Sequence, residues 1–600
     1  MFEVWMFLKR CSRRKCGKEH VYWQLVESLR TARGPRHRVV AYLGELASGE
    51  RRGWARLGRT LDGKPVSKLR QLTLFEGPDE GEAVPEEVEV SLHGVRVART
   101  RDFGEVFLAY SLWRILELDE VLGETLSGGR ERIGFEVMAC LLTIARLVEP
   151  SSELHVEDTW YRRTALADLL GVEVESVHHD RLYRTLDAVL PLKEKIEKHL
   201  KRRAESLFEG DFEILLYDVT STYFEGMAAD NPQAKRGHSR DHRADCKQVC
   251  IALVVRPDGF PLGFEVFDGN RTDVTTLEDI VNAMEAKYGR ARRIWVLDRG
   301  IVSEANLAFL RDRGGAYVVG TPRKMLKAYE AHLLTQGWSE VRPGVEVKLL
   351  ISPEGPETFV LCRSAERREK EKAIHERFAR RIEEGLASLA RRLAKARTRC
   401  DLGAVQRQIG RLLGRNSRAA GAFRVEVTPD PARPAGVKAE WSRVGSWEEW
   451  SSASEGCYLL RTNLTDLGPE ELWRTYTQLT DVEEAFRTQK SELRIRPIWH
   501  HREHRVQGHI LFCFLAYVLW KTLQLWMERS GLGRGVRTVL EEFARIKAND
   551  VILRTTQGRD IKLCCVTQPD KAQQVLLERL GIRLPERIGR PVWVPGCSTS

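Results

Sequence analysis

Two short apolar runs in the middle of the chain each end in an aspartate. Residues 214–217 are followed by Asp218, and residues 294–297 are followed by Asp298. Apolar runs of about four to eight residues between polar ones predict buried β-strands. An aspartate at a strand end usually turns the chain, and burying it costs free energy unless it is paired. The pattern predicts two strands and leaves open whether their aspartates are structural or functional.

Strand and helix patterns alternate around these two runs. Residues 247–255 and 261–267 flank a turn that contains Pro, Asp and Gly, and they predict a β-hairpin. Residues 272–289 and 303–314 have helical periodicity, and residues 316–321 predict another strand. The order is three strands, helix, strand, helix, strand. Because a meander precedes strands that alternate with helices, this order predicts an α/β fold with a mixed sheet.

The remaining patterns divide the 600 residues into six parts. Residues 1–75 carry short strand patterns, and a stretch rich in Gly, Pro and Glu follows them and predicts a linker. Helical spacing then continues until about residue 208, and a second apolar helix pattern returns after residue 466. The expected boundaries are 1–75 for a small strand-containing unit, 76–103 for a linker, 104–208 for a helical region, 209–325 for the first part of the core, 326–465 for an insertion and 466–590 for the second part of the core.

The insertion contains a long, Arg-rich helical pattern. Its apolar residues are spaced three or four apart and form one stripe: Ile374, Phe378, Ile382, Leu386, Leu389 and Leu393. Residues 405–413 repeat the pattern and predict the second helix of a hairpin. We interpret this arm as a packed structural element with solvated charges; a surface that tracks DNA is the alternative.

The charge balance favours a polyanionic partner. The formal net charge is +11, with 42% hydrophobic and 30% charged residues, which is typical of a soluble globular protein. A basic chain favours nucleic acid first and an anionic membrane second. The most apolar run, residues 510–520, is shorter than the roughly 20 residues of a membrane span and predicts a buried core helix.

A third acid completes a candidate metal site. If the strands that end in Asp218 and Asp298 are neighbours, both carboxylates emerge at one edge of the sheet. Tyr476, Glu483 and Lys490 are seven residues apart, which is nearly two helical turns, so they share one stripe of a predicted helix. Oxygen ligands suit Mg²⁺, and two such ions can activate water for phosphodiester cleavage. Each acid taken alone is more often structural, but together with the basic charge they favour catalysis.

The spacing around Glu483 resembles that of DDE transposases of bacterial insertion sequences, in the subgroup marked by Tyr-x2-Arg-x3-Glu-x6-Lys. The chain departs from this pattern at Leu479, where the family has Arg; Arg487 and Arg474 are candidates to supply the cation instead. The segments GHSRDHRADCKQVCIALVV, GFPLGFEVFDGNRTDVTTLEDI and VLDRGIVSEANL also resemble the family. The resemblance covers roughly residues 130–325 and 455–585.

The resemblance implies a ribonuclease-H-like catalytic core and a mainly helical N-terminal region that recognises element ends. It implies that Asp218, Asp298 and Glu483 bind two Mg²⁺ ions, for which Mn²⁺ can substitute. The residues expected to contact DNA are Tyr476, Lys490, Arg487 and Arg299. The expected partners are double-stranded DNA, both transposon ends and target, and a second copy of the chain on paired ends, with no membrane. The expected location is the bacterial cytoplasm, in association with the nucleoid.

The sequence leaves several alternative functions open. A nuclease that cuts without joining would use the same acids, and a DNA-binding protein from a decayed or domesticated element would need none of them. The basic loop 235–243 either contacts DNA or is a solvated surface loop. We interpret four histidines near the C-terminal core helix as DNA-facing or structural: His500, His501, His504 and His509.

Overall fold

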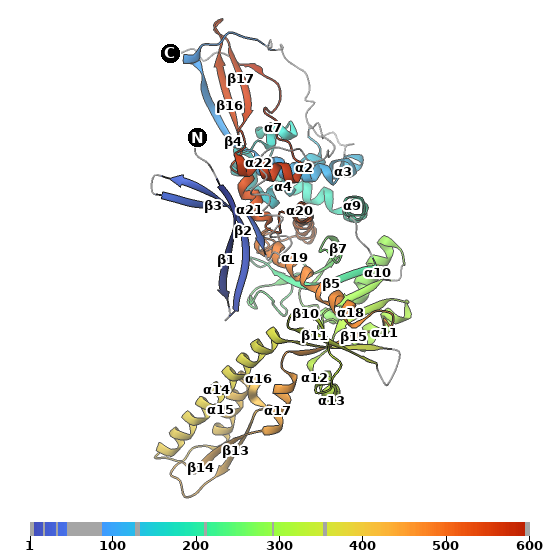
Figure 1. Ribbon diagram of the computed structural model, residues 1–600, viewed down its shortest axis with the longest axis vertical. Helices are drawn as coiled ribbons and strands as arrows, with labels where there is room; N and C mark the ends of the chain where they lie inside the picture. The colour runs from blue at the N-terminus through green and yellow to red at the C-terminus, as the bar shows by residue number, and fades with distance from the viewer. Residues whose placement is uncertain are drawn as a thin grey trace.

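The computed structural model describes residues 5–15, 18–31, 34–44, 84, 87–126, 133–208, 213–290, 293–351 and 357–594. The protein is elongated, with a central α/β body between a small sheet at one end and an arm at the other (Figure 1). Before residue 84, only the backbone of a three-stranded antiparallel sheet is described, and its strands are β1 (Trp5–Lys15), β2 (Lys18–Thr31) and β3 (Gly34–Gly44).

The central sheet has nine strands in the order β10-β11-β12-β15-β9-β8-β5-β6-β7. A meander at one edge pairs antiparallel, and its strands are β5 (Ile214–Tyr223), β6 (Gln248–Val255) and β7 (Pro261–Asp268). Two strands continue the sheet parallel to β5, namely β8 (Ile294–Leu297) and β9 (Ala316–Gly320). The mixed sheet expected from the sequence is confirmed.

Strands of the insertion extend this sheet. They are β10 (Ser339–Arg342), β11 (Val345–Ile351), β12 (Thr358–Ser364) and β15 (Cys457–Thr462), and β15 pairs antiparallel with β9. The insertion is therefore part of the main sheet as well as an arm. The arm itself consists of α14 (Ala365–Lys395), α15 (Leu402–Arg415), α16 (Ser417–Ala420), β13 (Phe423–Pro429), β14 (Val437–Arg443) and α17 (Gly445–Ser454). Four residues of the predicted stripe of α14, Ile382, Leu386, Leu389 and Leu393, are buried against α15 and the β13–β14 hairpin, which favours the interpretation of a packed structural arm.

Helices cover both faces of the central sheet because side chains along β5 alternate between two cores. Leu215, Tyr217 and Val219 pack with α10 (Leu277–Tyr288) and α11 (Glu304–Asp312). Leu216 faces the other core, together with α19 (Leu479–Ser491) and α20 (Glu503–Arg529). The N-terminal helices join that second core and are α2 (Gly104–Ile115), α3 (Leu118–Leu126), α4 (Phe135–Val148), α5 (Glu153–His155), α6 (Tyr161–Arg163), α7 (Leu166–Leu170), α8 (His179–Val189) and α9 (Lys193–Leu207).

Helix α20 is the central core helix. Its length and hydropathy would suit a membrane span, but 94% of its apolar window is buried inside the protein. Neighbouring core helices supply this burial, so its apolar character is explained by packing. The other helices of the C-terminal half and of the core are α12 (Arg323–Leu326), α13 (Glu330–Leu333), α18 (Pro469–Thr477), α21 (Val536–Phe543) and α22 (Lys571–Leu580).

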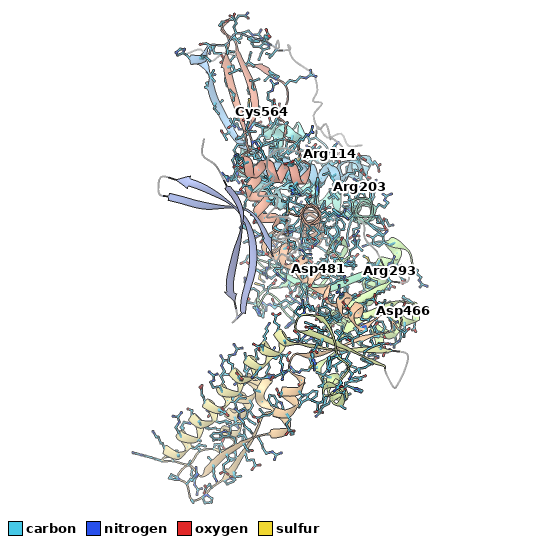
Figure 2. The ribbon with its side chains drawn as sticks, viewed as in Figure 1. Arg114, Arg203, Arg293, Asp466, Asp481 and Cys564 are labelled. Carbon is cyan, nitrogen blue, oxygen red and sulfur yellow. The ribbon has the colours of Figure 1, made fainter. Side chains whose placement is uncertain are left out.

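A four-stranded sheet joins the predicted linker to the C-terminus. Its order is β18-β17-β16-β4, with β4 (Arg96–Asp102), β16 (Lys547–Arg554), β17 (Asp560–Val566) and β18 (Val592–Val594). The linker expected over 76–103 is therefore wrong at its end, where β4 forms by pairing with a strand about 450 residues away. The buried guanidinium of Arg101 joins the two segments: it lies 2.5 Å from Asp550 and 3.1 Å from the Sγ of Cys564, which is labelled in Figure 2.

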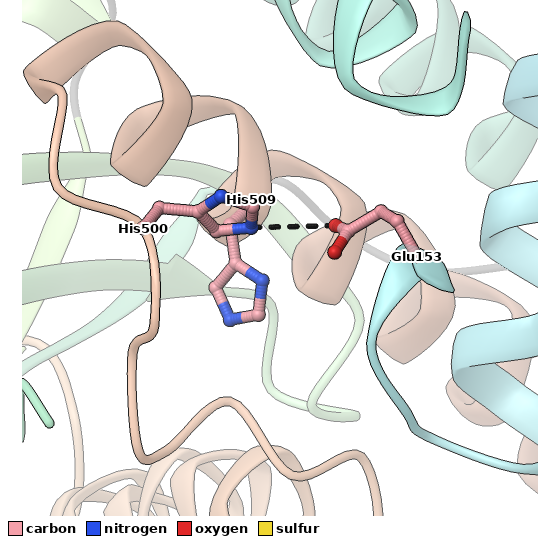
Figure 3. Close-up of side chains that lie close together, drawn as sticks. All are labelled: Glu153, His500 and His509. Atoms are coloured by element: carbon pink, nitrogen blue, oxygen red, sulfur yellow. Dashed lines mark ion pairs between the residues drawn. The ribbon is translucent and has the colours of Figure 1, made fainter. Parts of the chain in front are cut away.

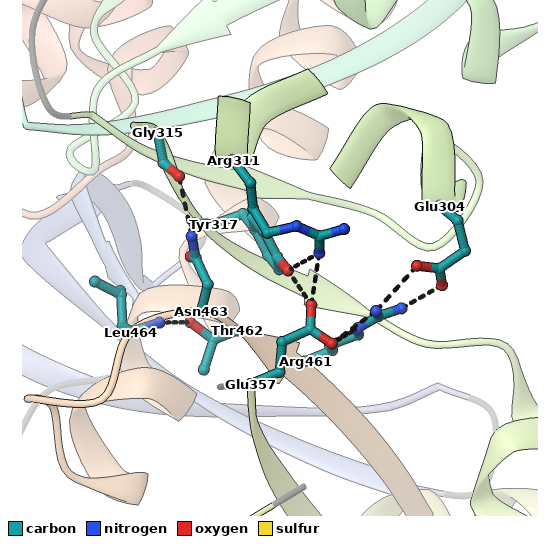
Figure 4. Close-up of polar contacts among 9 residues, drawn as sticks. All are labelled: Glu304, Arg311, Gly315, Tyr317, Glu357, Arg461, Thr462, Asn463 and Leu464. Carbon is teal, nitrogen blue, oxygen red and sulfur yellow. Dashed lines mark hydrogen bonds and ion pairs between the residues drawn. The ribbon is translucent and has the colours of Figure 1, made fainter. Parts of the chain in front are cut away.

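A polar network fixes the place where the chain returns from the arm to the sheet (Figure 4). Arg461 of β15 donates to Glu357 at 2.8 Å and pairs with Glu304 of α11. The side chain of Asn463 accepts from the backbone N–H of Tyr317 at 2.9 Å and donates to the carbonyl of Gly315 at 3.0 Å. These contacts hold β15 against β9, and β15 in turn leads into α18 and α19.

Candidate active site

The two aspartates lie on or directly after neighbouring parallel strands. Tyr217 of β5 pairs with Leu297 of β8, so Asp218 and Asp298 occupy the next position on each chain segment. The expectation that Asp218 ends its strand is wrong, because β5 continues to Tyr223 by pairing with β6, whereas Asp298 directly follows the last residue of β8. Adjacent strands are about 4.8 Å apart, and their carboxylates therefore begin from neighbouring points at the same edge of the sheet. The sequence analysis made this proximity conditional on the two strands being neighbours, and the sheet order meets that condition.

Glu483 reaches the same edge from helix α19. It lines one cavity of about 270 Å³ together with Asp218, Asp298 and a fourth acid, Asp273. The next residue, Glu484, turns elsewhere and lies 3.7 Å from Arg534. Val482 and Phe486 are buried on the core face of the helix, so the register expected for Glu483 matches the structure.

The acidic groups repel one another, and this is visible at Asp218. Its pKa is raised to about 7, mainly by burial and also by the charges of Asp298 and Asp273, which together outweigh the opposing effects of the Val219 N–H and Arg240. Like charges this close favour protonation unless a cation neutralises them. Carboxylate oxygens without imidazole or thiolate are the donor set of Mg²⁺ and Mn²⁺. The residues at this edge therefore fit the divalent metal that the resemblance implies.

The stripe expected from Tyr476 to Lys490 requires one helix, but the structure has two, α18 and α19, separated at Gln478. The hydroxyl of Thr477 donates to the carbonyl of Arg474, and that of Thr480 donates to the carbonyl of Thr477. Such side-chain bonds compete with the helical ladder, which accounts for the break. The expectation of one continuous stripe is wrong, because Tyr476 belongs to α18 while Glu483 and Lys490 belong to α19.

Tyr476 nevertheless reaches the acids. It lines a second cavity of about 240 Å³ with Asp218, Asp298 and Glu483, and its hydroxyl packs against Gly320. Burial raises the pKa of its phenol, and the charge of Asp298 adds to that effect. Tyr476 is therefore a neutral hydrogen-bonding group beside the carboxylates.

Lys490 is engaged by a partner that the sequence did not indicate. Its ammonium lies 2.9 Å from Asp241, which also pairs with Arg496. Asp241 is only 3% exposed and Lys490 12% exposed, and burial lowers the pKa of Lys490. The pair anchors the basic loop 235–243 to helix α19, so Lys490 does not line either of the two acid-bearing cavities.

The other residues expected to contact DNA lie on the surface. Arg299 directly follows Asp298, is exposed and lines a third cavity of about 710 Å³, whereas Arg487 is exposed on α19. Arg240 of the basic loop pairs with Asp273, so this loop adjoins the acids. The sequence analysis did not indicate the place of Asp273 in the cavity. The only available signal was an Asp shortly after a strand.

A second group of possible metal ligands lies away from the cavity. Ligand atoms of Glu153, His500 and His509 lie within 4.8 Å of one another (Figure 3), and His500 is 3.3 Å from Glu153. His509 contacts the carbonyl of Ile495 at 3.2 Å. The nearby positive charge of Arg146 acts on both Glu153 and His509, and it opposes a bound cation. We interpret this cluster as a buried polar link between α5 and α20, which favours the structural reading of His500 and His509.

This cluster predicts a pH effect on stability. Burial lowers the pKa of His509 to about 3, with Arg146 and His500 adding to the effect. Burial raises the pKa of Glu153, but His500 and Arg146 outweigh it and lower that pKa to about 2, so Glu153 stays charged from pH 7 to pH 5. Over that range the unfolded chain binds a proton at His509 that the folded chain does not. The wild type should therefore lose about 2 kcal/mol more than His509→Gln between pH 7 and pH 5.

Urea unfolding at both pH values measures this difference. His501→Gln is the matched control, since His501 is exposed, and its loss should equal that of the wild type. Equal losses in the wild type and His509→Gln would show that His509 titrates normally in the folded state.

Two family models match parts of the chain. Residues 209–519, more than half of the chain, match the family model described as "Transposase DDE domain". Residues 8–70 match the model "IS1634 family transposase, N-terminal domain". No curated protein matches the chain. One similar solved structure is a piggyBac transposase synaptic complex with hairpin DNA, which is 9% identical with a TM-score of 0.35; the match covers 76% of this chain and 82% of that one.

Proposed function

The chain belongs to the DDE transposases of bacterial insertion sequences, and from this we propose that it cuts DNA at the inverted repeats of such an element and joins the ends to a target. The observation that carries the proposal is the cavity shared by Asp218, Asp298 and Glu483, which come from two strands and a helix. The mixed sheet with helices on both faces supports a ribonuclease-H-like core. Because its proposed substrate is chromosomal DNA, we propose that the protein acts in the bacterial cytoplasm, in association with the nucleoid.

In the proposed mechanism, Asp218, Asp298 and Glu483 would hold two Mg²⁺ ions, or Mn²⁺ in their place. When bound, such ions activate the attacking oxygen and stabilise the leaving oxygen of a phosphodiester. The two aspartates are fixed by rigid neighbouring strands, and the core face of α19 fixes Glu483. Tyr476 offers a neutral hydroxyl at the rim, where it hydrogen-bonds the strand that enters. Preorganisation of this kind avoids the cost of arranging the groups during reaction.

The proposed chemistry has two balanced steps. Hydrolysis adds water across a P–O3′ bond and leaves a 3′-hydroxyl and a 5′-phosphate. In strand transfer that 3′-hydroxyl attacks a target phosphodiester; a new P–O bond forms, the target P–O3′ bond breaks, and the proton passes to the departing target 3′-oxygen. Both steps place negative charge at the acids, so the cations and the surrounding arginines must balance it.

DNA contacts in this proposal come from several parts of the chain. Arg299 and Arg487 are exposed and available for phosphates, whereas Lys490 must exchange Asp241 for a phosphate before it can contact one. The helical region 104–208 recognises the element ends in this proposal, and residues 8–70, which match a transposase N-terminal domain, precede it. A homodimer on paired ends brings two such cavities to one synapse.

A strand-transfer assay tests the proposal. Purified protein, labelled DNA carrying the inverted repeat that flanks the gene, and supercoiled target are incubated with Mg²⁺ or with EDTA. We expect metal-dependent cleavage at the repeat and covalent joining to the target. Cleavage without joining would support the plain nuclease, and binding to the repeat without cleavage would support a protein from a decayed or domesticated element.

A further inference from the structure

The second cavity is lined in part by basic side chains that lie outside the two core segments. Its lining includes Asp218, Asp298, Glu483 and two basic residues, Arg342 and Arg367. Both arginines belong to the insertion: Arg342 ends strand β10, and Arg367 lies in the first turn of α14. The insertion thus closes one side of the space above the carboxylates.

Leu479 lines the same cavity, at the position where the family pattern has Arg. Neither candidate from the sequence fills that role. Arg474 is 2.7 Å from Glu470 on its own helix, and Arg487 lines neither acid-bearing cavity. An apolar side chain cannot balance the charge of a phosphate beside three acids. If DNA enters here, its phosphate needs cations from another element.

The position of Arg342 allows it to supply one of these positive charges. Its guanidinium lies 5.3 Å from the centroid of the Trp473 ring on α18, and the residue is exposed. It makes no ion pair with any residue that the structure describes. A guanidinium resting on an aromatic face is held in position while its N–H donors stay available for a phosphate.

Arg367 is held in a similar way. It lies 4.8 Å from the centroid of the Tyr458 ring, and its Nε donates to Glu371 at 3.2 Å. Its terminal nitrogens have no hydrogen-bond partner in the described part of the chain. Tyr458 and Arg367 also line the third cavity, so they stand where the two cavities meet. The basic residues there are Arg299, Arg323, Arg367, Lys370 and Arg418.

Two guanidinium groups at one cavity can bind the same anion. A DNA strand can serve as this anion, because it carries a phosphate at each nucleotide and the third cavity continues the basic lining away from the acids. A solvated surface role does not explain why both guanidinium groups stack on aromatic residues at the rim of an acidic cavity.

We propose that Arg342 and Arg367 bind the phosphate that flanks the scissile one, so that the insertion supplies the cations absent at Leu479. The proposal rests on the proposed function, since it needs a DNA strand at the acids. It makes both arginines DNA-positioning groups, and it makes the arm and its strands part of the reaction centre.

The test compares Arg342→Ala, Arg367→Ala and the double variant with the wild type. Each lost charge-assisted contact should slow cleavage of repeat DNA about tenfold, and the double variant should be about 100-fold slower. Affinity for the repeat should change less than about threefold, since the N-terminal contacts persist. Arg380→Ala is the matched control, because Arg380 is an exposed arginine on α14 that lines none of the three cavities, and it should cleave normally.

A neutral methylphosphonate identifies the contacted phosphate. Placed in turn at each phosphate beside the scissile one, it should slow the wild type at one position and leave the double variant unaffected there. Leu479→Arg in the double variant should restore at least about tenfold of the rate. A merely structural role for the two arginines would produce neither the insensitivity nor the rescue.

The outcomes separate the two proposals. A wild type that cleaves while the double variant keeps its rate would overturn the role of the arginines and leave the function intact. Equal slowing of the wild type and the double variant by every methylphosphonate would overturn it as well. A wild type that cleaves no repeat DNA in any divalent metal would overturn the proposed function, and this proposal with it.

Discussion

Alanine at Asp218, Asp298 or Glu483 should abolish DNA cleavage while leaving repeat binding intact. Each change removes one carboxylate from the shared cavity. Metal ions supply several kcal/mol of transition-state stabilisation in phosphodiester chemistry, so the loss should be about 1,000-fold or more. The affinity for repeat DNA should stay the same or increase, because a variant with one carboxylate fewer repels the DNA phosphates less. Cleavage in Mg²⁺ and binding in Ca²⁺, measured on the same repeat DNA, give the two readouts.

Glu484→Ala is the control for this experiment. It removes the adjacent carboxylate on the same helix, but Glu484 lies near Arg534 and lines neither acid-bearing cavity. It should retain most activity. Calorimetric titration of Mn²⁺ without DNA adds an independent measurement, in which the three alanine variants should bind weakly and Glu484→Ala normally. An inactive Glu484→Ala beside an active Glu483→Ala would show that the third ligand is misassigned.

The positions of the acids could be predicted because each depends on local pattern. Four apolar residues before Asp218 and before Asp298 mark strands. The sequence left open whether those strands are neighbours, and the sheet order shows that they are. The helix around Glu483 has a core face at Val482 and Phe486, which sets the direction of the glutamate. Short-range periodicity was therefore enough to predict which acids form the candidate site. It did not predict the break between α18 and α19, which places Tyr476 on a different helix from Glu483.

What could not be predicted depends on contacts between distant segments. Strand β4 exists by pairing with β16, and no local pattern specifies a partner across that length of chain. The ion pair of Lys490 with Asp241 joins a helix to a loop some 250 residues earlier. Arg342 and Arg367 are ordinary surface arginines in the sequence, and only the extension of the sheet by β10–β12 brings them to the acids.

The network at the return from the arm should be sensitive to the loss of one partner. Arg461 is 10% exposed and Glu357 13% exposed, and the two lie 2.7 Å apart. Arg461→Ala leaves the carboxylate of Glu357 partly unpaired in a poorly hydrated place. Removing one partner of such a pair is strongly destabilising, so the free energy of unfolding should fall by about 3 kcal/mol. Urea unfolding measures the fall, and amide hydrogen exchange should accelerate in β9 and β15.

Arg311→Ala is the matched control, because Arg311 contacts the same carboxylate at 2.9 Å from a more exposed position. Surface ion pairs contribute about 0–1 kcal/mol, and Tyr317 still donates to Glu357 in this variant, so its loss should be small. Strand β15 leads into α18 and α19, which carry Tyr476 and Glu483. Faster exchange confined to the arm, with β9 and β15 unchanged in Arg461→Ala, would contradict the view that this network fixes the insertion on the sheet and so holds the third acid in place.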